Sequence, residues 1–248
     1  MQICIAGKNK CAVDFVKLLI SQEKYHFEIL ILPNSNDTGQ DGWQPSLKKF
    51  AIENNLKIID LEYCYKIKNL IFISIEFDKI VKTENFISSN LYNFHFSLLP
   101  KYRGCHTNFL QIYNGEKYSG VTLHKMDNGI DTGDIIDKIK FTINLNDTSF
   151  ENYCRLMDTS VKLFKKNLHI LIEKKYALSK QNLSEGSYFS IKSVNYKDLL
   201  NVNIKNEDLA THNQIRALIF PAFQYPIVNG KKVKKSIFSN NKIILEYL

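Results

Sequence analysis

The chain has 248 residues, of which 44% are hydrophobic and 23% are charged. This composition excludes a disordered chain and allows a real core, in one large domain or in one domain with a small appendage. The formal net charge of +8 favours anionic ligands and leaves phosphorylated small molecules and nucleic acid open.

The five cysteines are scattered and form no CxxC spacing. This pattern supports neither a disulfide framework nor a zinc site, so we expect no metal. The apolar run at the start is too short for a signal peptide, and no later run approaches membrane-spanning length. We therefore expect a cytoplasmic protein with no membrane partner.

The first part of the chain alternates apolar runs with segments of helical spacing. The apolar runs predict strands at residues 2–6, 27–32, 57–60 and 69–77. Helical periodicity predicts helices at residues 12–20 and 45–55. This alternation predicts an α/β fold, with a Rossmann-like, mostly parallel sheet and flanking helices. No GxGxxG follows the first strand, so a nicotinamide cofactor is not expected.

The pattern changes in the second part of the chain. Apolar residues at helical spacing predict a long helix at 149–173, with a break near Asp158 left open. A further helix is expected near residues 207–219, and Asn229-Gly230 between strand-like runs predicts a hairpin. We therefore predict a catalytic domain at residues 1–186. A small C-terminal module with a helix and a β-hairpin is predicted at 187–248.

Two polar side chains mark the strand that begins at Leu91. Strand alternation places Asn93 and His95 on one face of this strand, because successive side chains point to opposite faces. An amide can donate to an oxyanion, and an imidazole can donate or accept a proton near neutral pH. A carboxylate is the natural third member, and the glycine-flanked loop around Asp131 suits one. Each feature alone is also compatible with a core histidine or an ordinary turn.

The combination of motifs resembles the folate-dependent formyltransferase superfamily. The segments that carry the resemblance are Asn93-Phe94-His95-Phe96-Ser97-Leu98-Leu99-Pro100, Gly120-Val121-Thr122-Leu123-His124 and Asn128-Gly129-Ile130-Asp131-Thr132-Gly133-Asp134. The superfamily includes methionyl-tRNA formyltransferase, glycinamide ribonucleotide transformylase and the sugar N-formyltransferases. The resemblance implies an enzyme that transfers a formyl group from 10-formyltetrahydrofolate to an amine.

The resemblance also implies roles for individual residues. Asn93 and His95 would contact the formyl oxygen, and Asp131 would assist proton transfer. His95 would be the base, a donor to the oxyanion, or both in sequence, and His124 would have a supporting or a structural role. The folate would be held mainly by backbone around six positions, Ile75, Phe77, Ile80, Lys125, Asp127 and Gly129.

Three further segments look like those of the sugar N-formyltransferases. They lie at residues 36–47, 103–108 and 216–221. The implied substrate is a nucleotide-linked amino sugar, with dTDP-4-amino-4,6-dideoxyglucose or a close isomer expected, for bacterial O-antigen or a similar surface glycan such as lipopolysaccharide. A homodimer through the C-terminal hairpin is expected from the resemblance alone.

Five side chains are candidates for binding the nucleotide sugar, namely Trp43, Arg103, Arg216, Phe220 and Tyr225. The aromatic rings would stack on the base, and Arg216 or a lysine would meet the pyrophosphate. The alternative for Phe220 and Tyr225 is that they pack the appendage against the main domain. Trp43 is open between a ligand wall and a hydrophobic plug.

Other functions remain as alternatives to sugar formylation. Methionyl-tRNA formyltransferase would require a basic surface, whereas the loop at residues 34–43 has two Asp and no Lys or Arg, so we expect no nucleic-acid partner. Glycinamide ribonucleotide transformylase would require turnover of that ribonucleotide. A hydrolase that releases formate would need no amine, and a non-catalytic nucleotide- or RNA-binding module would not depend on His95 or Asp131.

Overall fold

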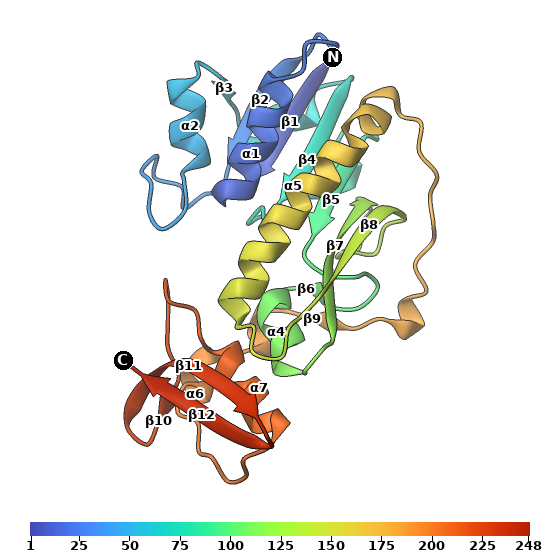
Figure 1. The fold of residues 1–248 in the computed structure, drawn as a ribbon. Helices are drawn as coiled ribbons and strands as arrows, with labels where there is room; N and C mark the ends of the chain where they lie inside the picture. Colours follow the sequence, from blue (N-terminus) through green and yellow to red (C-terminus); the bar gives the residue numbers. More distant parts are fainter. The chain divides into compact units, whose positions relative to one another are not determined.

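The computed structural model describes residues 1–248, which divide into two compact units (Figure 1). Unit 1 consists of Met1–His95, Val121–Ile139 and Met157–Ser184. Unit 2 consists of Phe96–Gly120, Lys140–Leu156 and Glu185–Leu248. No helix combines the length and the hydropathy that crossing a membrane requires.

A seven-stranded sheet forms the centre of unit 1, in the order β3-β2-β1-β4-β5-β7-β8. Its strands are β1 (Gln2–Gly7), β2 (Glu28–Pro33), β3 (Lys57–Ile58), β4 (Leu70–Ile75), β5 (Leu91–His95), β7 (Tyr118–Lys125) and β8 (Ile135–Thr142). β1 pairs in parallel with β2 and β4, and β4 pairs in parallel with β5. β5 pairs antiparallel with β7. The predicted α/β fold with a mostly parallel sheet is confirmed.

The helices of this part are α1 (Asn9–Ile20), α2 (Leu47–Glu53), α3 (Leu61–Tyr65), α5 (Ser149–Glu173) and the 3-10 turn Thr83–Asn85. The predicted long helix is confirmed, and it continues without a break through Asp158. Its second part belongs to unit 1. Ser46 caps α2 by accepting from the Lys49 backbone N–H, so Pro45 stands before the cap rather than in the first turn.

Aromatic packing fixes which face of β5 meets the helices. The ring of Phe94 lies 4.9 Å from that of Phe15 in α1 and 5.8 Å from that of Phe164 in α5. Phe15 and Phe164 stack on each other at 4.1 Å. Because side chains alternate along a strand, Asn93 and His95 point away from this aromatic cluster. The apolar face thus orients the two polar side chains.

Unit 2 contains short elements around two apolar clusters. They are β6 (Arg103–Gly104), α4 (Thr107–Tyr113), β9 (Tyr188–Phe189), the 3-10 turn Ile191–Ser193, α6 (Tyr196–Leu199), α7 (Leu209–Ala217), β10 (Ile227–Val228), β11 (Lys231–Ser239) and β12 (Lys242–Tyr247). A further 3-10 turn, Leu183–Glu185, lies at the transition between the units. β10, β11 and β12 form an antiparallel sheet.

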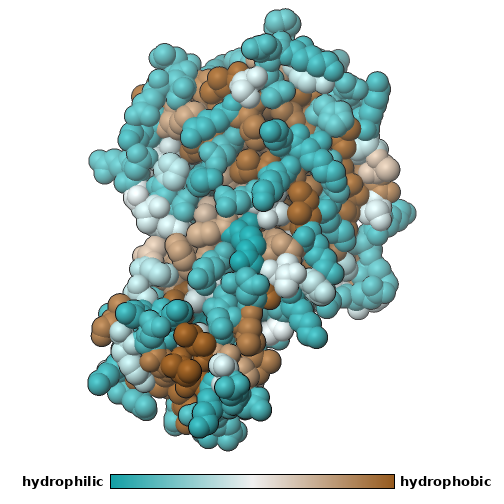
Figure 2. Space-filling view, viewed as in Figure 1, coloured by the Kyte–Doolittle hydropathy of each residue, from teal (hydrophilic) through white to brown (hydrophobic).

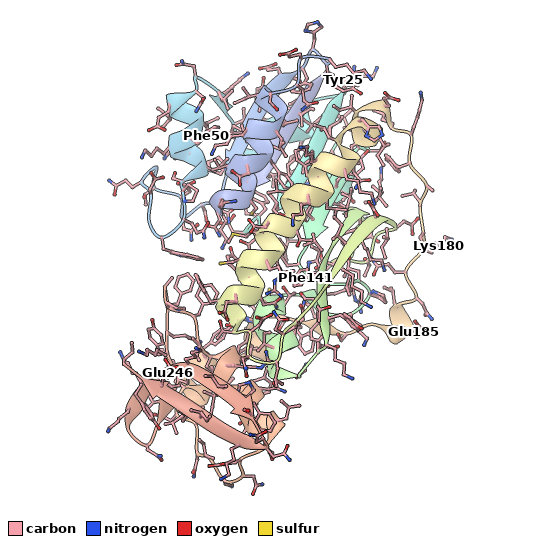
Figure 3. All side chains as sticks on the ribbon, in the orientation of Figure 1. Tyr25, Phe50, Phe141, Lys180, Glu185 and Glu246 are labelled. Carbon is pink, nitrogen blue, oxygen red and sulfur yellow. The ribbon has the colours of Figure 1, made fainter.

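The predicted hairpin is present. Asn229 and Gly230 join β10 to β11 with φ values of 51° and 74°, as a two-residue type I′ turn requires. Asn240 and Asn241 turn the chain in the same way between β11 and β12. Figure 2 shows apolar side chains over the sheet of β10, β11 and β12. The carboxylate of Glu246, which is labelled in Figure 3, lies 3.6 Å from the Lys235 ammonium of the neighbouring strand.

The two compact units divide the chain differently from the predicted boundary at residue 186. The last transition follows Ser184, but unit 2 also contains Phe96–Gly120 and Lys140–Leu156. The physical reason is that Phe109 and Leu110 of α4 share one apolar cluster with residues of the C-terminal part, among them Leu218. This packing joins segments far apart in the sequence.

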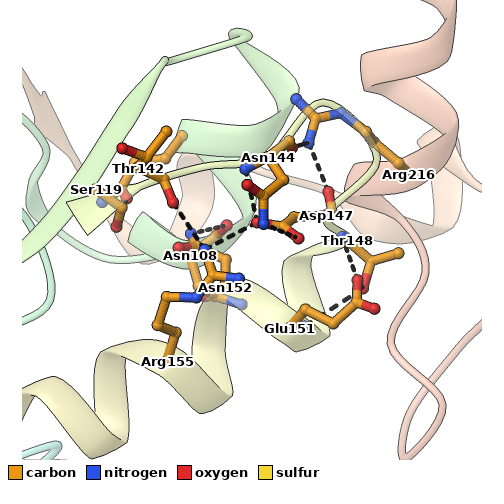
Figure 4. A network of polar contacts seen from close by, with 11 residues as sticks. Asn108, Ser119, Thr142, Asn144, Asp147, Thr148, Glu151, Asn152, Arg155 and Arg216 are labelled. Atoms are coloured by element: carbon orange, nitrogen blue, oxygen red, sulfur yellow. Dashed lines mark hydrogen bonds and ion pairs between the residues drawn. The ribbon is translucent and has the colours of Figure 1, made fainter. Parts of the chain in front are cut away.

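A buried polar network holds the turn before α5 in unit 2 (Figure 4). Arg216 is 3% exposed, and its guanidinium donates to the carbonyl oxygens of Asp147 at 2.5 Å and Asn144 at 3.4 Å. Burial lowers the pKa of Arg216 to about 10. Arg155 donates to the Asp147 carboxylate at 2.9 Å, and Thr148 forms a capping box with Glu151. The network fixes this turn through backbone carbonyls.

Gly7 allows β1 and β4 to pair closely, and we predict that Gly7→Ala destabilises the fold. A Cβ at this position would lie 2.0 Å from the Ile75 carbonyl oxygen. The free energy of unfolding, measured with denaturant, should fall by at least about 2 kcal/mol, because backbone must move. Gly42→Ala is the control, since its Cβ would meet nothing within 4 Å. Equal stability of Gly7→Ala and wild type would contradict this account.

His212 predicts a pH dependence of stability. Its ring is fully buried, with Nδ1 2.8 Å from the Ser236 hydroxyl and Nε2 3.0 Å from the Leu145 carbonyl oxygen, and burial lowers the pKa of His212. Below about pH 6.5, His212 binds a proton in the unfolded chain, whereas in the folded protein it binds one only at a lower pH. The His212 contribution is therefore complete above about pH 6.5 and is lost as pH falls toward the folded pKa. Unfolding free energies should separate wild type from His212→Gln more at pH 7.5 than at 5.5, and an equal separation at both would refute the assignment.

Candidate active site

β5 and β7 bring three polar side chains together in unit 1. Asn93 and His95 stand on β5, and the antiparallel register places His124 of β7 directly opposite Asn93. Asp131 lies in the loop that joins β7 to β8. Residues from two strands and one loop thus meet at one end of the sheet.

The Asp131 carboxylate links these groups. Its Oδ1 accepts from Asn93 Nδ2 at 3.1 Å and lies 3.5 Å from His124 Nε2, and its Oδ2 lies 3.4 Å from His95 Nδ1. The His95 side chain is 8% exposed and that of Asp131 is 12% exposed. The predicted constellation of Asn93, His95 and Asp131 is therefore assembled in space, largely screened from water.

The loop that carries Asp131 is held by its own hydrogen bonds. The Asp127 carboxylate accepts from the Gly129 N–H at 3.1 Å and the Thr132 hydroxyl at 2.7 Å. Gln181 donates from Nε2 to the carbonyl oxygens of Asp131 at 2.9 Å and Gly133 at 2.7 Å. These bonds support Asp131 in the left-handed region, at φ 54°. Such a conformation is costly for a residue with a side chain and persists only where neighbours fix it.

This arrangement can perform acid–base chemistry. A carboxylate beside an imidazole favours the tautomer with hydrogen on the facing nitrogen and stabilises the imidazolium. A positioned imidazole of this kind can accept a proton from an attacking group or donate a hydrogen bond to a developing oxyanion. An acyl transfer to an amine needs both abilities.

The six residues predicted for the folate lie in unit 1 with different exposures. Ile75 ends β4 and is buried, Phe77 packs against Phe72 at 6.5 Å between ring centroids, and Ile80 is 77% exposed. Lys125 ends β7, where its ammonium donates to the Ser89 carbonyl oxygen. The backbone of this region and of Asp127 and Gly129 stays the predicted folate contact.

The five residues predicted for the nucleotide sugar are not equally suited to it. Trp43, in unit 1, is 40% exposed, whereas Arg103 and Tyr225 of unit 2 are half-buried. Arg216 is buried and donates to backbone carbonyls, and its contact with a pyrophosphate stays a prediction. Phe220 is 8% exposed and packs against Phe150, Tyr153 and Phe223, so the packing alternative describes it.

Sequence reasoning missed Gln181 and left His124 open. Gln181 donates a hydrogen bond to the Asp131 carbonyl oxygen from a position 50 residues further along the chain, and no local motif indicates that contact. His124 did carry a signal, because it stands on a predicted strand just before the Asp131 loop. The missing information was the register of that strand against β5.

Comparisons with known proteins agree with this geometry. A family model described as formyl transferase matches residues 72–168, which include all four site residues. The methionyl-tRNA formyltransferase of Clostridioides difficile (strain 630) is 31% identical over 233 residues, which are 88% of this chain and 74% of that protein.

Solved structures give the same result. WlaRD, a sugar 3N-formyl transferase crystallised with dTDP and 5-N-formyl-THF, superposes with a TM-score of 0.94 at 43% identity over 100% of this chain and 98% of that one. An N-formyltransferase from Helicobacter canadensis, in complex with folinic acid and dTDP-3-aminofucose, gives 0.90 at 46% identity over 96% and 88%. From these matches and the assembled site, we conclude that this chain belongs to the formyltransferase family.

Proposed function

We propose that this protein transfers the formyl group of 10-formyltetrahydrofolate to the amino group of a dTDP-linked amino sugar. The observation that carries the proposal is the similarity, at 43% and 46% identity over nearly the whole chain, to two sugar N-formyltransferases. Their structures contain a formyl-folate together with dTDP or a dTDP-sugar. The fully formed Asn93, His95 and Asp131 constellation supports the same reaction.

We infer that the acceptor amine is on carbon 3 of the sugar. Both of these relatives are described by a 3-amino position, one as a 3N-formyl transferase and one with dTDP-3-aminofucose. A 4-N formyltransferase from Francisella tularensis is only 21% identical, which shows a shared fold and does not indicate the substrate. The 3-amino isomer is therefore favoured over the dTDP-4-amino-4,6-dideoxyglucose expected from the sequence.

Formylation of methionyl-tRNA is the second candidate. The methionyl-tRNA formyltransferases among the relatives of this chain support it, but at 31% identity or less. The loop at residues 34–43 offers no Lys or Arg to phosphate-rich RNA. The sugar is therefore the stronger candidate, and tRNA serves as the alternative acceptor in the assay below.

In the proposed mechanism, the sugar amine attacks the formyl carbon and a C–N bond forms. His95 accepts the proton that the amine loses, and the Asp131 carboxylate, 3.4 Å from Nδ1, stabilises the resulting imidazolium. The tetrahedral intermediate then collapses, its bond to the folate nitrogen breaks, and that nitrogen receives the proton. Asn93 orients a reacting group by hydrogen bonding.

We further propose a cytoplasmic homodimer that acts in the synthesis of a surface polysaccharide such as O-antigen. Support for the dimer comes from the exposed apolar side chains of the C-terminal strand and terminus, where Ile244 is 53% exposed and Leu248 is 68% exposed. A patch of this kind on a sheet edge marks a candidate association surface. Support for the pathway comes only from the substrate class.

The substrate assignment predicts a specific product. Incubation with 10-formyltetrahydrofolate and dTDP-3-amino-3,6-dideoxygalactose should add one formyl group to the sugar, detected by mass spectrometry. dTDP-4-amino-4,6-dideoxyglucose and methionyl-tRNA are the comparison acceptors, and kcat/KM should be highest for the 3-amino sugar. A higher kcat/KM for the 4-amino sugar would contradict the assignment of the acceptor amine to carbon 3. Formylation of tRNA alone would overturn the assignment of a sugar substrate.

The mechanism predicts the effect of two substitutions in the site. His95→Asn and Asp131→Asn should each lower kcat by at least about a hundredfold, the usual scale of a general acid–base contribution, without loss of the fold. His169→Asn, at an exposed position of α5, is the control and should retain wild-type turnover. Near-normal kcat in either active-site variant would rule out the assigned roles.

A further inference from the structure

The segment that follows α5 in unit 1 passes the start of β8, and we call this segment, residues 174–182, the strap. Figure 1 shows the strap beside β8. Ser179 of the strap and Ile135 of β8 exchange two backbone hydrogen bonds, at 2.8 and 2.9 Å. The Tyr176 hydroxyl lies 2.8 Å from the hydroxyl of Tyr92 on β5. The strap is therefore attached to two strands of the central sheet.

Gln181 is the side chain that links the strap to the loop between β7 and β8, which carries Asp131. Its Nε2 donates to the carbonyl oxygens of Asp131 at 2.9 Å and Gly133 at 2.7 Å. A carbonyl oxygen can only accept, so the NH2 end of the carboxamide must face the loop. The Oε1 of Gln181 is buried and accepts no hydrogen bond from the protein. Every hydrogen bond that this side chain makes within the protein is therefore made to this one loop.

These two hydrogen bonds restrict the backbone on which the Asp131 carboxylate stands. They hold the peptide planes that follow Asp131 and Gly133, and the peptide planes around a residue determine the direction of its Cα–Cβ bond. Asp131 has a φ of 54°, a conformation that needs such support. On its other side the loop lies against β7, because a Cβ at Gly133 would be 1.9 Å from the Lys125 carbonyl oxygen. The loop is thus held between β7 and Gln181.

We propose that Gln181 is a positioning residue that keeps the Asp131 carboxylate beside His95. Asp131 Oδ2 lies 3.4 Å from His95 Nδ1, and a displacement of about 1 Å would take it out of reach of that nitrogen, which is enough to slow a reaction strongly. Gln181 contacts only the backbone of the loop, so it acts through Asp131. This inference rests on the proposed function, in which the carboxylate stabilises the imidazolium of His95.

Substitution by methionine separates the hydrogen bonds of Gln181 from its packing. Gln181→Met keeps an unbranched side chain of similar length but removes both hydrogen-bond donors. kcat should fall by about tenfold to a hundredfold, the scale of a misplaced catalytic group, with KM for both substrates nearly unchanged. Gln22→Met is the matched control, because Gln22 also donates to a backbone carbonyl oxygen, that of Leu18 at 3.0 Å, and it should retain wild-type kcat. Wild-type kcat in Gln181→Met would overturn the proposal.

A double-substitution cycle tests whether Gln181 acts through the Asp131 carboxylate. In an Asp131→Asn background, Gln181→Met should lower kcat by less than about threefold more, because the carboxylate that it positions is gone. A role confined to folding predicts the same factor in both backgrounds. Equal factors would therefore contradict the positioning role.

A measurement without turnover keeps this proposal distinct from the proposed function. The ring nitrogens of His95 can be followed by 15N NMR at one fixed pH and assigned by their absence in His95→Asn. Asp131→Asn removes the carboxylate that faces Nδ1 and should move the Nδ1 resonance. Gln181→Met should move it in the same direction, whereas Gln22→Met should not.

The two proposals then fail in different ways. If no acceptor is formylated but Gln181→Met moves the His95 resonance as Asp131→Asn does, the proposed function fails and the positioning of Asp131 stands. If formylation occurs and the resonance keeps its wild-type position in Gln181→Met, the positioning role fails alone.

Discussion

The carboxylate of Asp131 is the interaction on which the candidate site depends. One side chain contacts Asn93, His95 and His124, and these come from two neighbouring strands. A carboxylate enclosed in this way must be matched by donors, because a buried charge without partners is costly. The hydrogen bonds that Gln181 makes to the Asp131 loop keep the charge in place. The loop, the strand pair and the supporting glutamine therefore form one polar unit.

The architecture of the sheet explains why this unit forms where it does. β5 continues the parallel part of the sheet, and β7 then reverses the direction of pairing. In this antiparallel pairing, His124 lies directly opposite Asn93. On the opposite face, Phe94 packs against Phe15 and Phe164, so the strand cannot rotate without losing apolar burial. Core packing thus determines the direction of the polar side chains.

Much of the fold follows from periodicities that are visible in the sequence. Alternation along β5 places Asn93 and His95 on one face, and Asn229-Gly230 specifies its hairpin turn because both residues tolerate positive φ. The motifs that resemble the formyltransferases group Asn93 and His95 with Asp131. These features are local, so a single sequence contains them.

The surroundings of Arg216 and Phe220 depend on contacts with segments that are distant in the sequence. Arg216 stands near an aromatic segment, as a ligand-binding arginine would, but its guanidinium is used by the carbonyl oxygens of Asn144 and Asp147. Phe220 is enclosed by Phe150 and Tyr153 in the same way. The burial of an arginine or an aromatic ring is set by the whole packing of the unit, and no short motif encodes it.

The acidic loop at residues 34–43 shows how the reason given for an expectation can be incomplete. Its two aspartates suggested repulsion of RNA, but Asp37 accepts from Gly39 N, Ser46 Oγ and Lys48 N. The hydrogen bond from Lys49 lowers the pKa of Asp41, whose charge is matched by that lysine. These carboxylates organise the loop and the start of α2, so they add little field beyond it. The loop differs from an RNA-binding surface because it contains no basic side chain. It exposes Trp43, whose flat ring suits a small ligand.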